Sequence, residues 1–123
     1  MSADGDRIRL TGLRAYGRHG VLPRERAEGQ EFTVDVVLAL DLREAGRTDD
    51  LARTVHYGEL ADRLVAVVGG EPVDLIETLA ERLAEVCLAD PRVREAEVSV
   101  HKPHAPIAHP FDDVAVTIVR SAG

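Results

Sequence analysis

Apolar and polar residues alternate in the first and last parts of the chain, which predicts four β-strands. In the segment 7–16 the alternation changes phase beside Gly12, as happens where a β-bulge inserts an extra residue. In the segment 32–42 every second residue is apolar without a break, so this strand is expected to bury one complete face. Two further alternating segments, 96–102 and 113–120, complete the set of strands.

Between the two pairs of strands, apolar residues recur at helical spacing and predict two helices. The first covers 57–68 and ends at the pair Gly69-Gly70. The second carries its apolar stripe from Ile76 to Cys87 and ends before Asp90-Pro91, because the residue before a proline avoids the α region. The order β-β-α-α-β-β predicts an α+β fold in which two helices cover one face of a four-stranded antiparallel sheet.

Two features of this expected fold bear on function. The long loop 17–29 joins the first two strands, and loops of that length inside a compact domain are usually functional. The sheet also has long edges whose backbone groups need partners, so we expect copies of the chain to assemble through them.

Composition limits the classes of function. A chain of 123 residues corresponds to a single domain, 1–123. The net charge of −7, without any basic run, disfavours binding to nucleic acid or to an anionic membrane. Residues 1–6 lack the apolar segment of a secretion signal, no apolar run is long enough to span a membrane, and the one cysteine, Cys87, cannot form an internal disulfide. These observations predict a cytoplasmic protein, with Cys87 as a core residue of its helix rather than a reactive thiol.

Lys102 is the only lysine among the 15 basic residues. Strand alternation places it on the same face as the apolar Val98 and Val100, at the end of the third strand. A partly buried lysine, unlike an arginine, can release its proton and take it back, so Lys102 is a candidate general base and acid. The alternative is a lysine whose stem lies on the core while its ammonium reaches water, and position alone favours that alternative.

Glu77 also has two interpretations. The pattern from Asp74 to Glu77 is typical of a capping box, with Asp74 as N-cap and Glu77 reaching back to it. Alternatively, the Glu77 carboxylate accepts two parallel N–H bonds from the amidine-like edge of a ligand. The pattern alone favours the cap. Tyr57 likewise has two interpretations: a half-buried aromatic residue, or a phenol that relays a proton.

The five histidines do not have the spacing of a metal site. They are His19, His56, His101, His104 and His109. A catalytic zinc ion needs three protein ligands in suitable geometry, and His101 is expected to face away from Lys102. His19 stands alone in its loop. We therefore expect no metal ligands among them.

Taken together and in order, several short motifs make the chain similar to the dihydroneopterin aldolases of the folate pathway. Each motif alone is weak, but several in register along nearly the whole chain are specific. The motifs are YGRHG at 16–20, GQ at 29–30, DLREAGRTDD at 41–50, TVHY at 54–57, LIETLAE at 75–81 and VHKP at 100–103. The family adopts the tunnelling fold, β-β-α-α-β-β, which is also the order of elements expected here.

The resemblance implies a reaction and roles for particular residues. The substrate would be 7,8-dihydroneopterin, cleaved by a retro-aldol reaction to 6-hydroxymethyl-7,8-dihydropterin and glycolaldehyde. The ring C=N bond beside the side chain would accept the electrons, so the resemblance implies no cofactor, metal or Schiff base. Lys102 would be the general acid and base, and Tyr57 a proton relay. Glu25, in the long first loop, would contact the trihydroxypropyl side chain as part of the catalytic group.

The resemblance further implies the shape of the binding site and the assembly. Glu77 would anchor the amino-pyrimidinone edge of the pterin, assisted by the backbone around Ile76. Family members form rings of four subunits, commonly stacked into octamers, with sites between subunits, so Tyr57 would come from a neighbouring copy. The remaining pocket-lining residues implied are Val55, His56, Val21 and Leu22. The segment His104–Pro110 departs most from the family pattern, together with the loop near Ala27-Glu28.

Three other functions remain open at this point. A dihydroneopterin epimerase would use similar residues, and family aldolases can themselves epimerise the side chain. A zinc-dependent pterin synthase of the same fold would need a histidine pair and a third ligand in one site. A catalytically silent pterin-binding or assembly module would have no reason to retain Lys102, Tyr57 and Glu77 together.

Overall fold

The four strands pair with their chain neighbours to form one antiparallel sheet, in the order β1-β2-β3-β4. The computed structural model describes residues 5–122, so four of the six N-terminal residues considered above for a secretion signal lie outside this range. The elements are β1 (Arg7–Gly17), α1 (Pro23–Glu28), β2 (Gln30–Ala39), α2 (Arg43–Thr48), the 3-10 helix η2 (Leu51–Arg53), α3 (Tyr57–Val68), α4 (Ile76–Leu88), β3 (Glu95–His101) and β4 (Ala115–Ser121). The α+β fold expected from the sequence is confirmed.

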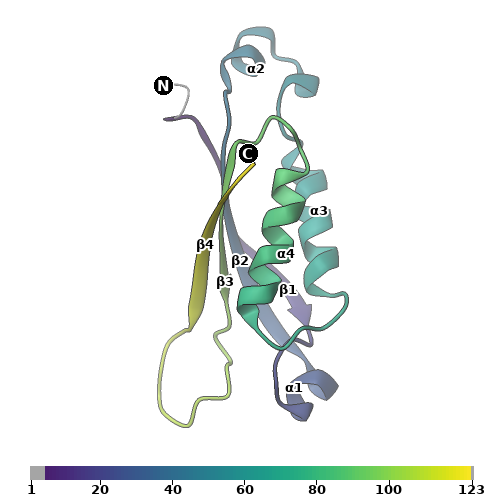
Figure 1. Cartoon of the computed structure of the whole chain (residues 1–123), viewed down its shortest axis with the longest axis vertical. Coiled ribbons are helices and arrows are strands. Elements are labelled where there is room, and N and C mark those ends of the chain that lie inside the picture. Colours follow the sequence, from purple (N-terminus) through teal and green to yellow (C-terminus); the bar gives the residue numbers. More distant parts are fainter. Residues whose placement is uncertain (1–4, 123) are drawn as a thin grey trace.

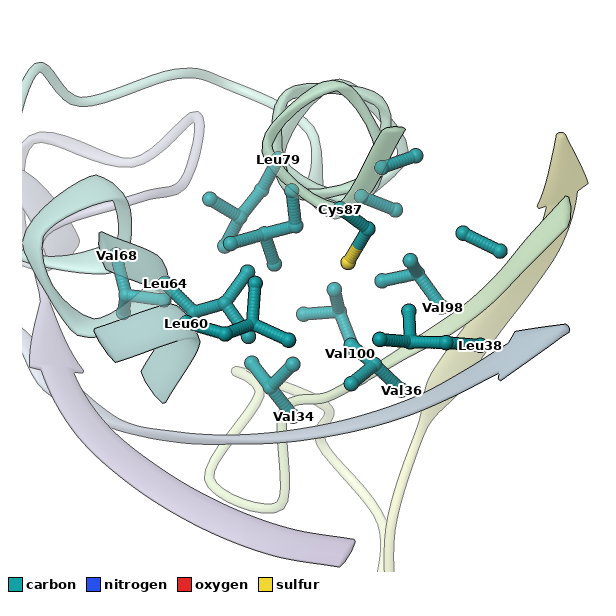
Figure 2. Close-up of a cluster of buried hydrophobic side chains, with 14 of the residues drawn as sticks. Val34, Val36, Leu38, Leu60, Leu64, Val68, Leu79, Cys87, Val98 and Val100 are labelled. Carbon is teal, nitrogen blue, oxygen red and sulfur yellow. The ribbon is translucent and has the colours of Figure 1, made fainter. Parts of the chain in front are cut away.

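The helices α3 and α4 lie side by side on one face of the sheet (Figure 1). The apolar face of β2 meets them with Phe32, Val34, Val36 and Leu38, all fully or almost fully buried. The inward side chains of β3 lie directly opposite this row, with Val100 paired to Val34, Val98 to Val36 and Ala96 to Leu38. Figure 2 shows the resulting core between helix and sheet, with the sulfur atom of Cys87 inside it.

The environment of Cys87 agrees with its expected role in the core. The side chain is buried, and this burial raises the pKa of its thiol to about 11. A thiol with so high a pKa carries almost no reactive thiolate at neutral pH.

The phase change in the first strand is a bulge, as the sequence predicts. The pairing of β1 with β2 shifts register between Leu10 and Leu13, and Gly12 adopts a positive φ of 75° that other residues rarely take. The backbone N–H of Gly12 donates a hydrogen bond of 2.7 Å to the carboxylate of Asp35 on β2. The bulge is thus held by a side chain of the neighbouring strand.

Two stretches differ from the sequence prediction. The strand predicted to reach residue 42 ends at Ala39, because Asp6 accepts hydrogen bonds from the backbone N–H groups of Leu40 and Leu42 and the chain turns into α2. The predicted loop 17–29 contains the short helix α1, which begins with Pro23 at a position where a proline's missing N–H costs nothing. Neither short helix has the apolar repeat by which the longer helices are recognised.

Among residues 5–122, no helix combines the length and the apolar character needed to cross a membrane.

Candidate active site

A buried ion pair joins the first loop to the end of the third strand. The Lys102 ammonium lies 2.6 Å from a carboxylate oxygen of Glu25 on α1. Only 9% of Lys102 and 5% of Glu25 is exposed. Lys102 continues the buried row of Val98 and Val100, as strand alternation predicts, and its backbone N–H donates to the carbonyl of Val114 at 2.8 Å.

The Glu25 carboxylate has further donors. The backbone N–H of Leu22 and the side-chain amide of Gln30 each donate to it at 3.2 Å. Burial by itself would raise the pKa of Glu25, but the hydrogen bonds from Lys102, Leu22 and Gln30 and the charge of Lys102 lower it below its usual range. Glu25 therefore stays a carboxylate at neutral pH. No pattern in the sequence indicated the contact of Gln30 with Glu25. The side-chain carbonyl oxygen of Gln30 is buried and has no hydrogen-bond partner among residues 5–122.

Two positions in this loop leave no room for a side chain and are occupied by glycine. Gly20 has a φ of 148°, and a side chain there would overlap the carboxyl group of Glu25. Gly29 ends α1 with a φ of 71°, and a side chain there would collide with the ring of Tyr16 and the carbonyl of Gly17. The positive φ angles and the lack of space for a side chain explain why the loop motifs contain glycine at positions 20 and 29.

The start of α4 lies at the same end of the molecule as α1 (Figure 1). The capping box expected there is wrong: the residue at the N-cap is Leu75, which has no side-chain acceptor. Asp74 instead accepts a hydrogen bond of 2.5 Å from the guanidinium of Arg26 on α1. The Glu77 carboxylate is exposed in the first turn of α4 and forms no hydrogen bond or ion pair with another residue of the range 5–122.

This end of the molecule also contains a cavity of about 180 Å³ beside Glu25. Its wall includes Gln30 and, from the connection between β3 and β4, His104 and Pro106. The exposed Val21 and Leu22 precede α1 at the same end. Six of the residues expected in the site therefore lie at this end of the molecule: Lys102, Glu25, Val21, Leu22, Ile76 and Glu77.

The other expected residues lie at the opposite end of the sheet. Val55, His56 and Tyr57 line a cavity of about 270 Å³ together with Ile8, near the start of β1. Lys102 and Glu25 are close to the other end of β1, where Gly17 pairs with Gln30. Since a strand rises about 3.3 Å per residue, the two ends of β1 are roughly 30 Å apart. One copy of the chain does not bring Tyr57, which is 66% exposed, to Lys102.

Comparison with known proteins identifies the family. The model of the family FolB, dihydroneopterin aldolase, matches residues 8–119. The dihydroneopterin aldolase of Streptomyces coelicolor is 64% identical over 94% of this chain and 98% of its own.

The chain belongs to the dihydroneopterin aldolase family.

Solved structures agree with this assignment. Escherichia coli dihydroneopterin aldolase, in complex with neopterin, is similar with a TM-score of 0.86 and 29% identity, over 94% of this chain and 99% of that one. The Burkholderia thailendensis enzyme, bound to guanine, has a TM-score of 0.77 and 29% identity, over 97% and 93% of the two chains. The activity of this chain is accordingly that of a dihydroneopterin aldolase, a lyase of folate biosynthesis.

His19 is a buried, hydrogen-bonded residue of this aldolase fold. The side chain is completely buried, with one ring nitrogen 2.7 Å from the carbonyl oxygen of Val68 and the other 3.1 Å from the backbone nitrogen of Val73. Within the range 5–122, the structure assembles no group of three His, Cys, Asp or Glu side chains that could hold a metal ion.

His101 faces away from Lys102, as predicted, and lies between two carboxylates. One ring nitrogen is 2.7 Å from Asp113 and the other is 2.7 Å from Asp35. The hydrogen bond with Asp113 raises the pKa of His101 most; partial burial opposes this, and Asp35 adds to the increase. Because both ring nitrogens face acceptors, the imidazolium form is the one that the fold stabilises.

The stability that His101 contributes is expected to depend on pH. A group whose pKa is raised by folding stabilises the fold fully below its unfolded value, about 6.5 for histidine, and loses this effect as the pH rises through the folded value. We expect His101→Gln to lower the free energy of unfolding by about 1 kcal/mol at about pH 5.5, and by clearly less at about pH 9. Urea unfolding at a fixed protein concentration measures both values. An equal loss at both pH values would show that the charge of His101 is not what stabilises the sheet.

Proposed function

We propose that the end of the sheet with Glu25 and Lys102 binds 7,8-dihydroneopterin and that Lys102 moves the proton in its cleavage. The observation that supports this most directly is the buried contact of 2.6 Å between the two side chains, beside a cavity. The bound ligands of the two solved relatives, neopterin and guanine, share an amino-pyrimidinone edge. We therefore expect this chain to bind the amino-pyrimidinone edge of its substrate.

The reaction needs one proton to leave and one to return. Lys102, as the free amine, takes the proton from the hydroxyl group on the second carbon of the side chain. The bond between the first and second carbons breaks, its electrons pass to the ring C=N bond, and glycolaldehyde leaves. The Lys102 ammonium then returns a proton to the first carbon, and Tyr57 relays protons between the site and water. Glu25 holds Lys102 at hydrogen-bond distance and contacts the trihydroxypropyl side chain.

Glu77 is suited to anchor the pterin. Its carboxylate is exposed at the start of α4 and is not engaged by a cap, so both of its oxygens are available to accept parallel N–H bonds. The backbone of Ile76 lies beside it. Val21 and Leu22 offer apolar side chains to the face of the ring.

The separation of the two halves of the site supports an assembly with shared active sites. Val55, His56 and Tyr57 of one subunit would complete the pocket formed by Glu25, Lys102 and Glu77 of its neighbour. The exposed edges of β1 and β4 are the natural contacts for a ring of four, and two rings would stack into an octamer. We further propose that the whole chain, 1–123, acts as one domain in the cytoplasm, without a cofactor.

Replacing Lys102 with alanine is expected to separate chemistry from binding. Turnover of 7,8-dihydroneopterin should fall by roughly two or more orders of magnitude, the usual scale for a general acid and base, while pterin affinity is largely retained. Glycolaldehyde release in the presence of excess EDTA measures turnover, and neopterin titration measures affinity. Near-normal turnover in the variant would exclude Lys102 as the acid and base.

Glu77→Ala is the matched comparison. This variant should weaken neopterin binding and raise KM, because it removes the acceptor of two charge-assisted hydrogen bonds. The free energy of unfolding should change little, since Glu77 forms no cap in the structure. A loss of stability with unchanged pterin affinity would contradict the anchoring role.

Mixing two inactive variants tests whether sites are shared. Lys102→Ala and Tyr57→Phe each damage one half of the site. If the halves come from different subunits, unfolding and refolding the two variants together should restore activity at roughly one site in four, because subunits mix at random. Each variant refolded alone is the control. A mixture no more active than the two controls would place Tyr57 and Lys102 in separate functions.

A further inference from the structure

We infer that His19 is a positioning residue of the pterin site: it joins the loop that carries Glu25 to the connection between α3 and α4, and so sets the place of Glu77 relative to Lys102. This inference rests on the proposed function for the location of the site. His19 itself touches none of the proposed catalytic groups in the described contacts. Its effect is exerted through residues on either side of it.

The two hydrogen bonds of His19 determine its protonation. The backbone N–H of Val73 can only donate, so the nitrogen Nδ1 that faces it, at 3.1 Å, must be an acceptor. The ring proton is therefore on Nε2, which donates to the carbonyl oxygen of Val68 at 2.7 Å. The neutral imidazole thus joins the last residue of α3 to the segment that leads into α4.

Gly20, the residue after His19, adds a further bond to this link between the loop and the α3–α4 connection, which we call the junction. The backbone N–H of Gly20 donates to the carbonyl of Val73 at 2.9 Å, so both polar backbone groups of Val73 are bound by residues 19 and 20. The ring of Phe32 on β2 meets the His19 ring edge-on, with centroids 5.4 Å apart. Because the side chain is completely buried among these neighbours, close packing holds the His19 ring in a single orientation.

The junction continues to both halves of the proposed site. On one side, Gly20 packs directly against the carboxyl group of Glu25. On the other side, Arg26 donates to the carbonyl of Gly20 at 2.9 Å and to the Asp74 carboxylate at 2.5 Å. Asp74 stands shortly before the first residue of α4. A shift of the α3–α4 connection would therefore move Glu77 relative to Glu25.

Protonation of His19 is expected to open this junction. An imidazolium donates from both nitrogens, and Nδ1 would then face another donor, the N–H of Val73. Burial lowers the pKa of His19 most; the Val68 carbonyl opposes this, and three nearby cations lower it further. The three cations are Arg82 of α4, Arg26 of α1 and Lys102, which follows β3. The other elements packed against the ring present uncharged residues to it: Gly17 of β1, Phe32 of β2 and Val68 of α3. The junction is thus intact above about pH 6.5 and weakens as the pH falls through the lowered pKa.

The test compares KM for 7,8-dihydroneopterin in the wild type and in His19→Gln, from about pH 5 to about pH 8. Glutamine cannot titrate and does not span both Val68 and Val73. We expect the KM of the variant to be raised roughly 10- to 100-fold near neutral pH, the scale of a small misplacement of binding groups. The ratio of the two KM values should then shrink toward acid pH, because the wild type loses its junction there. A folded variant whose KM equals that of the wild type, or whose KM ratio is independent of pH, would overturn the inference.

A second variant decides the matter if His19→Gln does not fold. Asp74→Asn weakens the outer link to Arg26, which lies at the surface, and should raise KM several-fold with little change in the free energy of unfolding. Glu44→Gln is the matched control, because it removes a carboxylate from a similarly exposed pair with Arg47, on α2. Equal KM values in Asp74→Asn, Glu44→Gln and wild type would then overturn the inference. A wild type that releases no glycolaldehyde would instead contradict the proposed function.

Discussion

The buried pair of Glu25 and Lys102 is the interaction on which the candidate site depends. Removing two charges from water is costly, and the cost is offset only when the geometry is close and the remaining acceptor sites are filled. Here the ions are 2.6 Å apart, and the Leu22 and Gln30 donors complete the carboxylate. Such a pair is weak evidence of stabilisation, so its presence at the end of an otherwise apolar row is better explained by chemistry that needs an amine held in place.

The fold supplies this amine and its carboxylate but not the whole site. Alternation along β3 turns Lys102 inward, the helix α1 brings Glu25 to it, and α4 begins nearby with the exposed carboxylate of Glu77. The exposed phenol of Tyr57 is at the far end of the same sheet. A ring of copies arranged head to tail along the edges would bring such ends together, and the edge strands would then help to build the site as well as the assembly.

The sequence allowed part of this to be predicted. Period-two alternation was sufficient to orient Lys102 and to turn His101 away from it, because that rule is local and the strand is regular. The contact with Glu25 could not be found this way, since it depends on a loop folding back over a distant strand end. The expected cap at Glu77 was wrong for the same reason: the local pattern is genuine, but Asp74 has a long-range partner, Arg26, that local rules do not include. The proposed positions of Tyr57 and Glu77 in the site rest on the family resemblance.

A crystal structure of this protein with bound neopterin would show directly whether the end of the sheet with Glu25 and Lys102 is the pterin site. We expect the pterin at the end of the sheet where α1 lies near the start of α4, with its amino-pyrimidinone edge on Glu77 and its hydroxylated side chain within hydrogen-bond distance of the Lys102 ammonium. The phenol of Tyr57 from a neighbouring subunit should complete the pocket. Neopterin bound elsewhere, with the Glu25–Lys102 pair remote from it, would show that this pair does not belong to the pterin site.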